Sequence, residues 1–334
     1  MSKQDIRLQQ IQSWLENDLQ LSISAIEPAS SDASFRRYFR TQINDKNHII
    51  MDAPPQQENL ESFLKVTQLM SASGINVPII HHQNIEQGFL LLEDFGSLCY
   101  LDKLNQQTAP ELYQKAMNTL LILQQNTDIN RCFLPEYDYD RLNTELDLFR
   151  NWFVQKLLNV PLNDELNKIL DKIWQLLIES ALQQPRVCVH RDYHSRNLMY
   201  SDSEQPGVID FQDAVVGPIT YDLVSLLRDC YITWPDQQVT NWVDDYYQQL
   251  VANQQIHVDR KQFQRWFDLM GLQRHLKAIG VFARLKIRDN KHSYVQDIPR
   301  TMNYVTKVCQ QYHELSEFNE ILKQHILPVD HLSQ

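Results

Sequence analysis

Glycine is scarce in this chain of 334 residues, which contains only seven. No two of them lie closer together than Gly88 and Gly96. A Walker A loop requires two glycines about five residues apart, and a dinucleotide-binding fingerprint requires three within about six residues. Both motifs are therefore excluded, and any nucleotide must be bound without a glycine-rich loop of either kind.

Basic residues are a minority. The chain carries 31 Lys and Arg against 42 Asp and Glu, a formal net charge of -11. Proteins that bind nucleic acids usually present a basic face to the phosphates. We therefore expect no nucleic-acid partner.

Closely spaced cysteines and long apolar runs are also missing. The five cysteines include no C-x-x-C pair, which argues against a thiolate zinc site or a redox dithiol and is typical of a reducing compartment. No apolar run approaches the ~18 residues of a membrane span, and the first residues lead into a polar stretch without the apolar core of a signal peptide. We expect a soluble, cytoplasmic protein with no membrane partner.

The spacing of apolar residues divides the chain into two parts. It predicts a helix over 4–20, strands over 22–26, 34–41 and 48–52, a helix over 60–69, and strands over 77–81 and 89–94. Residues 97–185 and 220–326 are predicted to be mostly helical, with short strands at 187–189, 198–200 and 208–209 between them. The expected fold class is α+β, with a small β-rich lobe over 1–95 and a larger, mostly helical lobe over 96–334.

The segment between the helical regions carries the chemistry. It reads His190-Arg191-Asp192, then Asn197 five positions later, and Asp210 follows the next apolar strand. Phosphoryl transfer from a nucleotide needs one carboxylate to orient the attacking hydroxyl and a pair of oxygen ligands to hold Mg²⁺ on the phosphates. The alternative is a surface loop in which Asp and Asn cap turns. Because the motif is flanked by strands on both sides, we favour a kinase.

These residues resemble the kinase-like small-molecule phosphotransferases, the superfamily of aminoglycoside phosphotransferases and choline kinases. The two-lobed layout agrees over nearly the whole chain. Longer strings resemble a narrower group, the anomeric sugar kinases that phosphorylate N-acetylmuramate and N-acetylglucosamine in bacterial cell-wall recycling. These strings are residues 31–40, 51–55, 210–213, 217–218, 221–223 and 273–277.

The resemblance implies a protein-kinase-like fold, ATP as co-substrate and Mg²⁺ as cofactor. It assigns Asp192 as the catalytic base or hydroxyl-orienting residue, Asn197 and Asp210 as Mg²⁺ ligands, and His190 as a structural residue. Residues 92–95, including Glu93 and Phe95, become the hinge whose backbone binds adenine. Asp222 opens an apolar helix, where an anchoring or capping role is more common than a catalytic one.

In the segments expected to bind the phosphates of ATP, the chain departs from the sequence pattern of the kinase-like superfamily. Ser31, Asp32 and Ser34 stand where a phosphate-covering loop would have glycines, and Met51-Asp52 stands where protein kinases place a phosphate-binding Lys. Glu58 or Glu61 would then lack the usual Lys partner. We expect Arg36, Arg37 or Arg40 to supply the positive charge, since Arg36 and Arg40 share one face of a strand. Exposed strand arginines are the alternative.

The acceptor site is predicted from charge. Residues 274–291 are locally basic, and Arg274, Lys277, Arg284 and Arg288 fall on one side of a helix. Such a row is usually a solvated face or a set of bridges to acids of the other lobe. If it lines the cleft, it suits a neutral or anionic acceptor such as the lactyl carboxylate of N-acetylmuramate. His194, Asp213 and Arg274 are the candidate acceptor contacts. A kinase for an aminoglycoside, choline or homoserine, a non-catalytic nucleotide-binding regulator, and a purely structural protein remain as alternatives.

Overall fold

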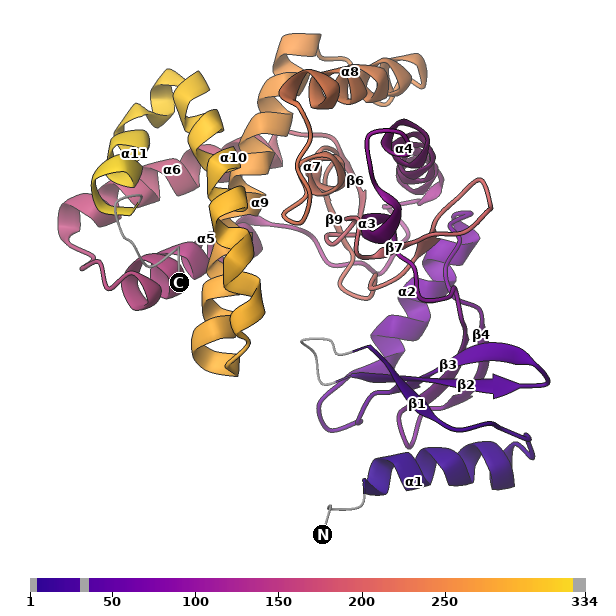
Figure 1. Cartoon of the computed structure of the whole chain (residues 1–334). Helices are drawn as coiled ribbons and strands as arrows, with labels where there is room; N and C mark the ends of the chain where they lie inside the picture. Colours follow the sequence, from indigo (N-terminus) through magenta and orange to yellow (C-terminus); the bar gives the residue numbers. More distant parts are fainter. Residues whose placement is uncertain (1–4, 31–35, 327–334) are drawn as a thin grey trace. The chain divides into compact units, whose positions relative to one another are not determined.

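The computed structural model describes residues 5–30 and 36–326, in which the chain forms two compact units (Figure 1). The first unit comprises Met1–Thr119 and Arg196–Gln212, and the second comprises Leu120–Ser195 and Asp213–Gln334. The predicted lobe boundary between residues 95 and 96 stays a prediction.

An antiparallel five-stranded sheet forms the framework of the first unit. Its strands are β1 (Glu27–Ser30), β2 (Arg37–Ile43), β3 (Lys46–Asp52), β4 (Ile80–Asn84) and β5 (Phe89–Glu93), in the order β1-β2-β3-β5-β4. Strands β2 and β3 pair from Arg37 opposite Asp52 to Ile43 opposite Lys46. Asn44 and Asp45 make the turn with φ of 50° and 61°, the left-handed conformation that a two-residue hairpin requires. The predicted turn is therefore confirmed.

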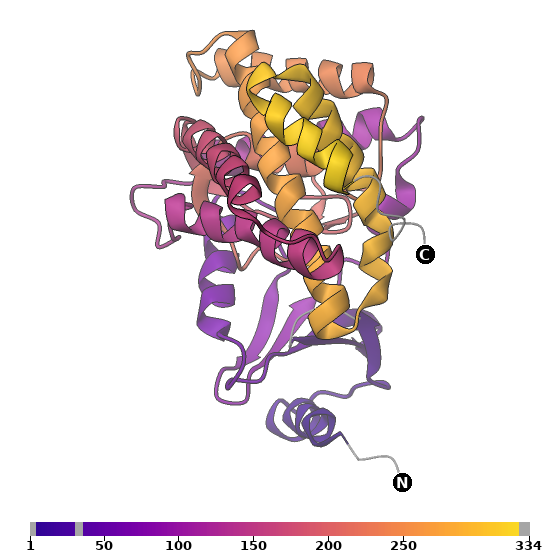
Figure 2. The same ribbon diagram turned by 90° about the vertical axis from the view of Figure 1, so that its left-hand side faces the viewer.

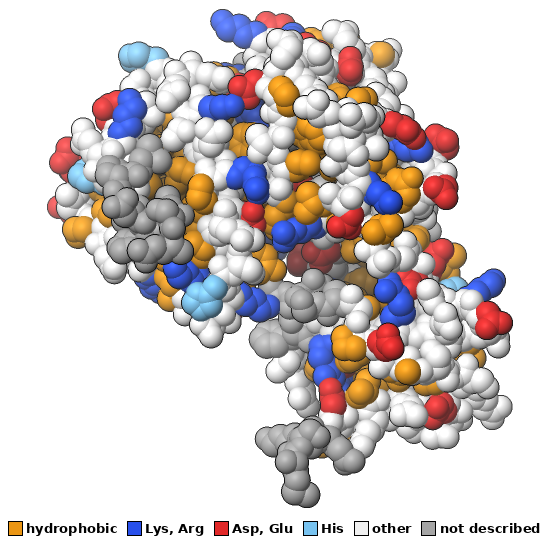
Figure 3. Space-filling view, in the orientation of Figure 1, with side chains coloured by type: hydrophobic (Ala, Val, Ile, Leu, Met, Phe, Trp, Pro, Cys, Tyr) orange, Lys and Arg blue, Asp and Glu red, His pale blue; other side chains and the backbone are white. Residues whose placement is uncertain are grey.

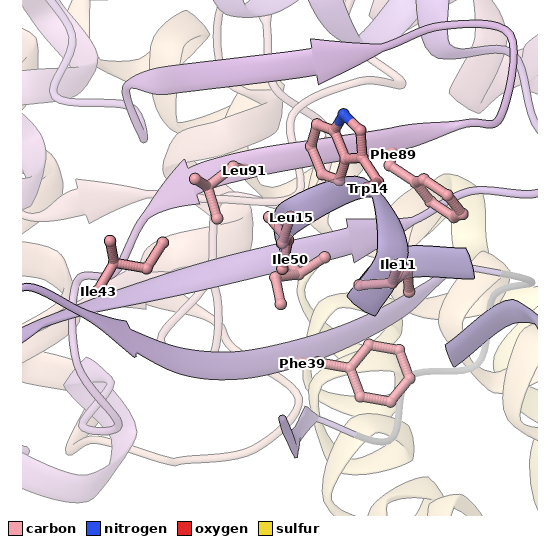
Figure 4. Packing of buried hydrophobic residues seen from close by; sticks show 8 residues of the cluster. All are labelled: Ile11, Trp14, Leu15, Phe39, Ile43, Ile50, Phe89 and Leu91. Atoms are coloured by element: carbon pink, nitrogen blue, oxygen red, sulfur yellow. The ribbon is translucent and has the colours of Figure 1, made fainter. Parts of the chain in front are cut away.

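Helix α1 (Ile6–Ser13) and the π-helical turn that continues it (Trp14–Asp18) cover one face of this sheet. Alternate residues of a strand point to the same face. The residues that share this face form one buried cluster with the helix: Ile11, Trp14, Leu15, Phe39, Ile43, Ile50, Phe89 and Leu91 (Figure 4). Met51 and Leu90, which alternate with them, are buried as well. Both faces of the sheet are therefore covered.

A buried carboxylate ties the helix to the sheet. Asp52 is fully buried at the end of β3 and accepts hydrogen bonds from Arg7 of α1 and Arg37 of β2. Arg37 also pairs with Asp5, which caps α1 through the backbone N–H of Leu8. The end of β3 thus anchors the N-terminal helix through Asp52.

The rest of the first unit consists of helices and a small hairpin. Helix α2 (Leu60–Ala72) buries Phe63, Val66 and Met70. Helices α3 (Tyr100–Lys103) and α4 (Ala109–Asn126) follow, with α4 continuing into the second unit. Strands β7 (Leu198–Met199) and β8 (Gly207–Val208) form the hairpin, whose residues 196–212 return to this unit.

The second unit is helical except for one strand pair. Its helices are α5 (Tyr139–Leu148) with a π-helical extension (Phe149–Leu157), α6 (Asp164–Leu182), α7 (Tyr221–Leu227), α8 (Asp236–Ala252), α9 (Arg260–Asp289), α10 (Ile298–Gln311) and α11 (Ser316–Ile321). Short 3-10 segments (His292–Asp297 and His313–Leu315) and a π-helical turn (Leu322–Ile326) complete it. Strand β6 (Arg186–Val189) pairs antiparallel with β9 (Val215–Pro218).

Helix α9 is the central element of this unit. It packs against α5, α6, α7 and α10, and α11 follows beside α10 (Figures 1 and 2). Its crossing with the α5 extension is close because Gly280 faces the backbone of Leu148 and Phe149, where a Cβ atom would come within 2.4 Å. A helix with neighbours on several sides is buried over most of its circumference, and α9 accordingly buries more than half of its residues.

Two predicted strands need correction, and a third strand was not predicted. Residues 22–26 contribute only an isolated bridge from Ile23 to Ile43, and the edge strand β1 follows at Glu27–Ser30. The strand predicted at 77–81 lies at Ile80–Asn84. Strand β9 was not predicted, because its Gly217-Pro218 end resembles a turn. Proline is tolerated in β1 because it is an edge strand that needs no N–H on one side. In β9 the proline is the last residue, and the other side of that strand is bonded to residues 135–137, where the Val216 N–H donates to the Pro135 oxygen at 2.9 Å.

None of the helices among the described residues is long and apolar enough to cross a membrane. On the face seen in Figure 3, acidic and basic side chains are interspersed instead of gathering in one area. The negative net charge is therefore spread thinly over this face.

Candidate active site

The loop after β6 is held at its start by a buried carboxylate. Asp222, in the first turn of α7, accepts the backbone N–H groups of His190 at 2.6 Å and Arg191 at 3.0 Å. The predicted anchoring role of Asp222 is thereby confirmed. Arg191 has a φ of 76°, which is unusual for a residue with a side chain. Such strain persists only where surrounding bonds enforce it, and the two bonds to Asp222 do so.

The His190 side chain and Ser195, at the end of the loop, are also held by hydrogen bonds. Buried His190 accepts the N–H of Asp192 on Nδ1 at 3.2 Å, which agrees with its expected structural role. Ser195 donates both its N–H and its hydroxyl to the buried carboxylate of Asp229. Asp192 therefore lies between two fixed ends. Asp229 belongs to no motif, so it could not be identified from the sequence.

Glu145 of α5 is the shared partner of several side chains in a buried polar cluster next to the loop. It pairs with Arg191 and with Lys277 of α9, and it accepts the hydroxyl of Tyr137. Arg191 additionally donates to the backbone oxygen of Asp213 at 3.3 Å. The side chain next to Asp192 is thus fixed by residues far away in the sequence. Neither Glu145 nor Tyr137 was identified from the sequence.

The cations around Asp192 keep it ionised. Burial by itself raises the pKa of Asp192, but Lys277, His194, Arg191 and Arg274 outweigh burial and hold that pKa below its ordinary value. The neighbouring Asp222 behaves in the opposite way. Burial raises the pKa of Asp222 to about 7, although the N–H groups of His190 and Arg191 oppose the rise. Two carboxylates with pKa values driven apart are typical of groups with different roles, and the ionised one is suited to accept a proton.

The three predicted acceptor contacts have different surroundings. His194 is partly buried, with its ring edge-on to Tyr231 at 5.3 Å between centroids. Asp213 is exposed. Arg274 is buried, with only 6% of its surface exposed. The expectation of a solvated basic face is therefore wrong for Arg274, and Lys277 bridges to Glu145 within its own unit instead of reaching an acid of the other lobe.

The two predicted metal ligands face each other in the first unit. Asn197 Nδ2 lies 3.4 Å from Asp210 Oδ2, and the backbone oxygen of Asn197 accepts the N–H of Ile209 at 3.1 Å. Asp210 has a φ of 64° and accepts Gln212 Nε2 at 2.9 Å. Within residues 5–30 and 36–326, no group of three or more His, Cys, Asp or Glu could hold a metal. Mg²⁺ commonly uses one or two carboxylates and completes its shell with water and phosphate oxygens, so the exposed carboxylate of Asp210 beside the Asn197 side chain fits this ion.

The arginines near the phosphate-covering segment have acidic partners. Arg36 Nε donates to Glu58 Oε2 at 3.0 Å, and both side chains are only 14% exposed. Glu58 therefore pairs with an arginine in place of the usual strand Lys, while Glu61 pairs with Lys65 of its own helix. Ser31, Asp32 and Ser34 lie outside the described residues.

Arg40 is bound to the predicted hinge. It donates to the carboxylate of Asp94 and to the backbone oxygen of Gly96. Glu93 Oε2 accepts the N–H of Ile79, which fixes the end of β5. Arg40 thus supports the strand end that carries Glu93 and Phe95, and Arg36 is the better candidate for a cation near phosphate.

Phe95 rests on the backbone of Gly207 in β8. A Cβ atom at Gly207 would lie 2.5 Å from Cδ2 of the Phe95 ring. We predict that Gly207→Ala displaces this ring, lowers the free energy of unfolding by about 1–3 kcal/mol and raises KM for ATP, with a smaller change in KM for the acceptor. Denaturant titration and steady-state kinetics measure both effects. Ser97→Ala, at an exposed position near the hinge, is the control. An unchanged KM for ATP in the Gly207 variant would contradict a role of Phe95 in the hinge.

Comparisons with known proteins agree with this geometry. Residues 25–257 match the model of the phosphotransferase enzyme family. An N-acetylmuramate/N-acetylglucosamine kinase of Pseudomonas putida is 44% identical over 96% of this chain and 97% of its own length. A kinase of the same name from Neisseria meningitidis is 38% identical, over 93% of this chain and 94% of its own.

Solved structures show the same fold at low sequence identity. An ADP-bound aminoglycoside phosphotransferase has a TM-score of 0.60 with 15% identity, covering 91% of this chain and 99% of its own. A choline kinase from Streptococcus pneumoniae has a TM-score of 0.63 with 13% identity, covering 90% and 99%. The predicted protein-kinase-like fold is therefore confirmed, and the chain belongs to the phosphotransferase enzyme family.

Proposed function

We infer that this protein is an ATP- and Mg²⁺-dependent sugar kinase that phosphorylates the anomeric hydroxyl of N-acetylmuramate and N-acetylglucosamine, the sugars of bacterial cell-wall recycling. The observation that carries this inference is the loop at Asp192, which keeps an ionised carboxylate among cations between two buried anchors. The name of the relatives that are 38–44% identical over nearly the full chain supports the choice of sugars.

In this reaction the anomeric oxygen forms a bond to the γ-phosphorus of ATP, and the bond from that phosphorus to the β-bridging oxygen breaks. Asp192 orients the hydroxyl and accepts its proton as the new bond forms. An anomeric hydroxyl is more acidic than an ordinary alcohol, so most of the catalysis comes from positioning and charge neutralisation. ADP leaves with the bridging oxygen, and the proton then passes to solvent.

The nucleotide is held by residues of the first unit. The backbone of Glu93 and Phe95 receives adenine, and Arg36 supplies positive charge near the phosphates. Asn197 and Asp210 hold Mg²⁺, which neutralises charge that develops on the phosphate oxygens. His194 and Asp213 contact the sugar.

The alternative acceptors differ in charge. Choline and aminoglycosides are cations, whereas Asp192 is surrounded by Arg191, Arg274 and Lys277. Like charges in a partly buried site repel, so this environment favours a neutral or anionic acceptor. A non-catalytic nucleotide-binding regulator would have no need for the complete set of Asp192, Asn197 and Asp210.

An acceptor panel tests the proposal. With ATP and Mg²⁺, release of ADP should be strong with N-acetylmuramate and N-acetylglucosamine, and weak with choline, homoserine and an aminoglycoside. NMR of the product should show the phosphate on the anomeric carbon, and chelation of Mg²⁺ by EDTA should abolish turnover. Rapid phosphorylation of a cationic acceptor would overturn the assignment of the sugar. If the protein binds ATP but releases no ADP in the presence of any acceptor, a non-catalytic nucleotide-binding regulator would be favoured.

A further inference from the structure

Among the residues that the structure describes, no carboxylate pairs with the buried cation Arg274. It lies in the middle of α9 with 6% of its surface exposed. Its only hydrogen bond to another described residue is a weak one of 3.8 Å from Nη1 to the Sγ of Cys230, and Nε has no partner. Burial of an unpaired guanidinium is costly. Such a group indicates that a negatively charged partner binds there.

The neighbouring Arg and Lys side chains already form ion pairs with carboxylates of the protein. Arg191 and Lys277 share Glu145, and Arg228 pairs with Asp268. Lys277 also contacts the hydroxyl of Tyr221 at 3.1 Å. Arg274 is therefore the cation of this cluster that retains its capacity to bind an anion.

Arg274 lies within electrostatic reach of the catalytic loop. Its charge acts on Asp192 and on Asp229, the two carboxylates in and beneath the loop. Arg274 also contacts Cys230, the neighbour of the Asp229 that holds Ser195, so an anion bound by Arg274 would lie close to the loop that carries Asp192. Because Arg274 and Asp192 belong to the same compact unit, this proximity is a property of that unit alone.

We propose that Arg274 binds the carboxylate of an anionic acceptor and thereby selects N-acetylmuramate over N-acetylglucosamine. The two sugars differ in a lactyl ether that carries the carboxylate. A guanidinium binds a carboxylate through two parallel hydrogen bonds, a geometry that a Lys cannot reproduce. The inference rests on the proposed function, and it adds the residue that distinguishes its two substrates.

The test compares the two sugars in one variant. In Arg274→Met, the ratio of kcat/KM for N-acetylmuramate to kcat/KM for N-acetylglucosamine should fall about 10- to 100-fold, the loss expected for hydrogen bonds to a charged group. Any effect on Asp192 or on folding acts on both sugars and cancels in the ratio. Arg284→Met, on the same helix with its Nε also lacking a partner, should leave the ratio unchanged.

A second variant and a binding measurement complete the design. Arg274→Lys should lower the ratio less than Arg274→Met, since it keeps the charge but loses the paired donors. An equal loss for both sugars in these variants would overturn the proposal. Calorimetry with N-acetylmuramate and no ATP separates it from the proposed function. Binding that depends on Arg274 in a protein that phosphorylates neither sugar would overturn the function and support the inference, and binding that is indifferent to Arg274 would overturn the inference alone.

Discussion

Replacing Asp192 by Asn is expected to lower kcat for sugar phosphorylation by about 10²- to 10⁴-fold, the range for loss of a general base. The amide has nearly the same shape, but it cannot accept the proton of the acceptor hydroxyl. The loop should keep its position, because His190, Arg191 and Ser195 are held by Asp222 and Asp229 through bonds that do not involve the Asp192 side chain.

The measurement is steady-state kinetics with N-acetylmuramate, together with a thermal shift on addition of Mg-ATP. The shift should equal that of the unsubstituted protein, since the nucleotide is held by other residues in our proposal. Asp245→Asn, an exposed position on α8, should behave like the unsubstituted protein in both assays. An Asp192→Asn enzyme that keeps most of its kcat would show that Asp192 is not the base.

Replacing Asp222 by Ala should give the largest loss of stability among the substitutions considered. The N–H groups of His190 and Arg191 would lose their acceptor inside the protein. A buried donor left unsatisfied costs about 1–3 kcal/mol, so the two together should lower the free energy of unfolding by about 2–6 kcal/mol. Because the same bonds hold Arg191 in its left-handed conformation, kcat should fall as well, even where the variant is fully folded.

Asp222→Asn separates charge from hydrogen bonding. The ordinary pKa of an Asp is 3.8, whereas burial raises that of Asp222 to about 7. The folded protein therefore binds a proton that the unfolded chain has released between about pH 4 and pH 7, and the contribution of this group to stability is lost as the pH rises through that window. Asn does not titrate, so denaturant midpoints should show a stability difference between the two proteins that changes from pH 4 to 7 and is constant above pH 8. Parallel pH curves would contradict the raised pKa of Asp222.

Much of the fold could be predicted because its signals are local. The turn at Asn44-Asp45, helix α2 and the strands β3, β5, β6, β7 and β8 follow from periodicity and turn residues over fewer than about 15 positions. The motif residues could be identified for the same reason: Asp192, Asn197 and Asp210 lie within one short segment. The strands β1 and β9 could not be predicted because β1 contains proline and β9 contains glycine and proline, residues that usually end strands.

The chemical groups of the site can be identified from the order of residues alone, but their surroundings cannot. The pairing of Arg36 with Glu58, the support that Arg40 gives Asp94 and the bond from Arg191 to Glu145 across 46 positions of the chain exist only because folding brings these residues together. The basic row on α9 shows the same limit, since its spacing predicted a common face while folding buried Arg274 and paired Lys277. Periodicity reports which residues of an element point the same way. Burial, and with it the partner and the pKa of each charge, depends on which distant element packs against that face.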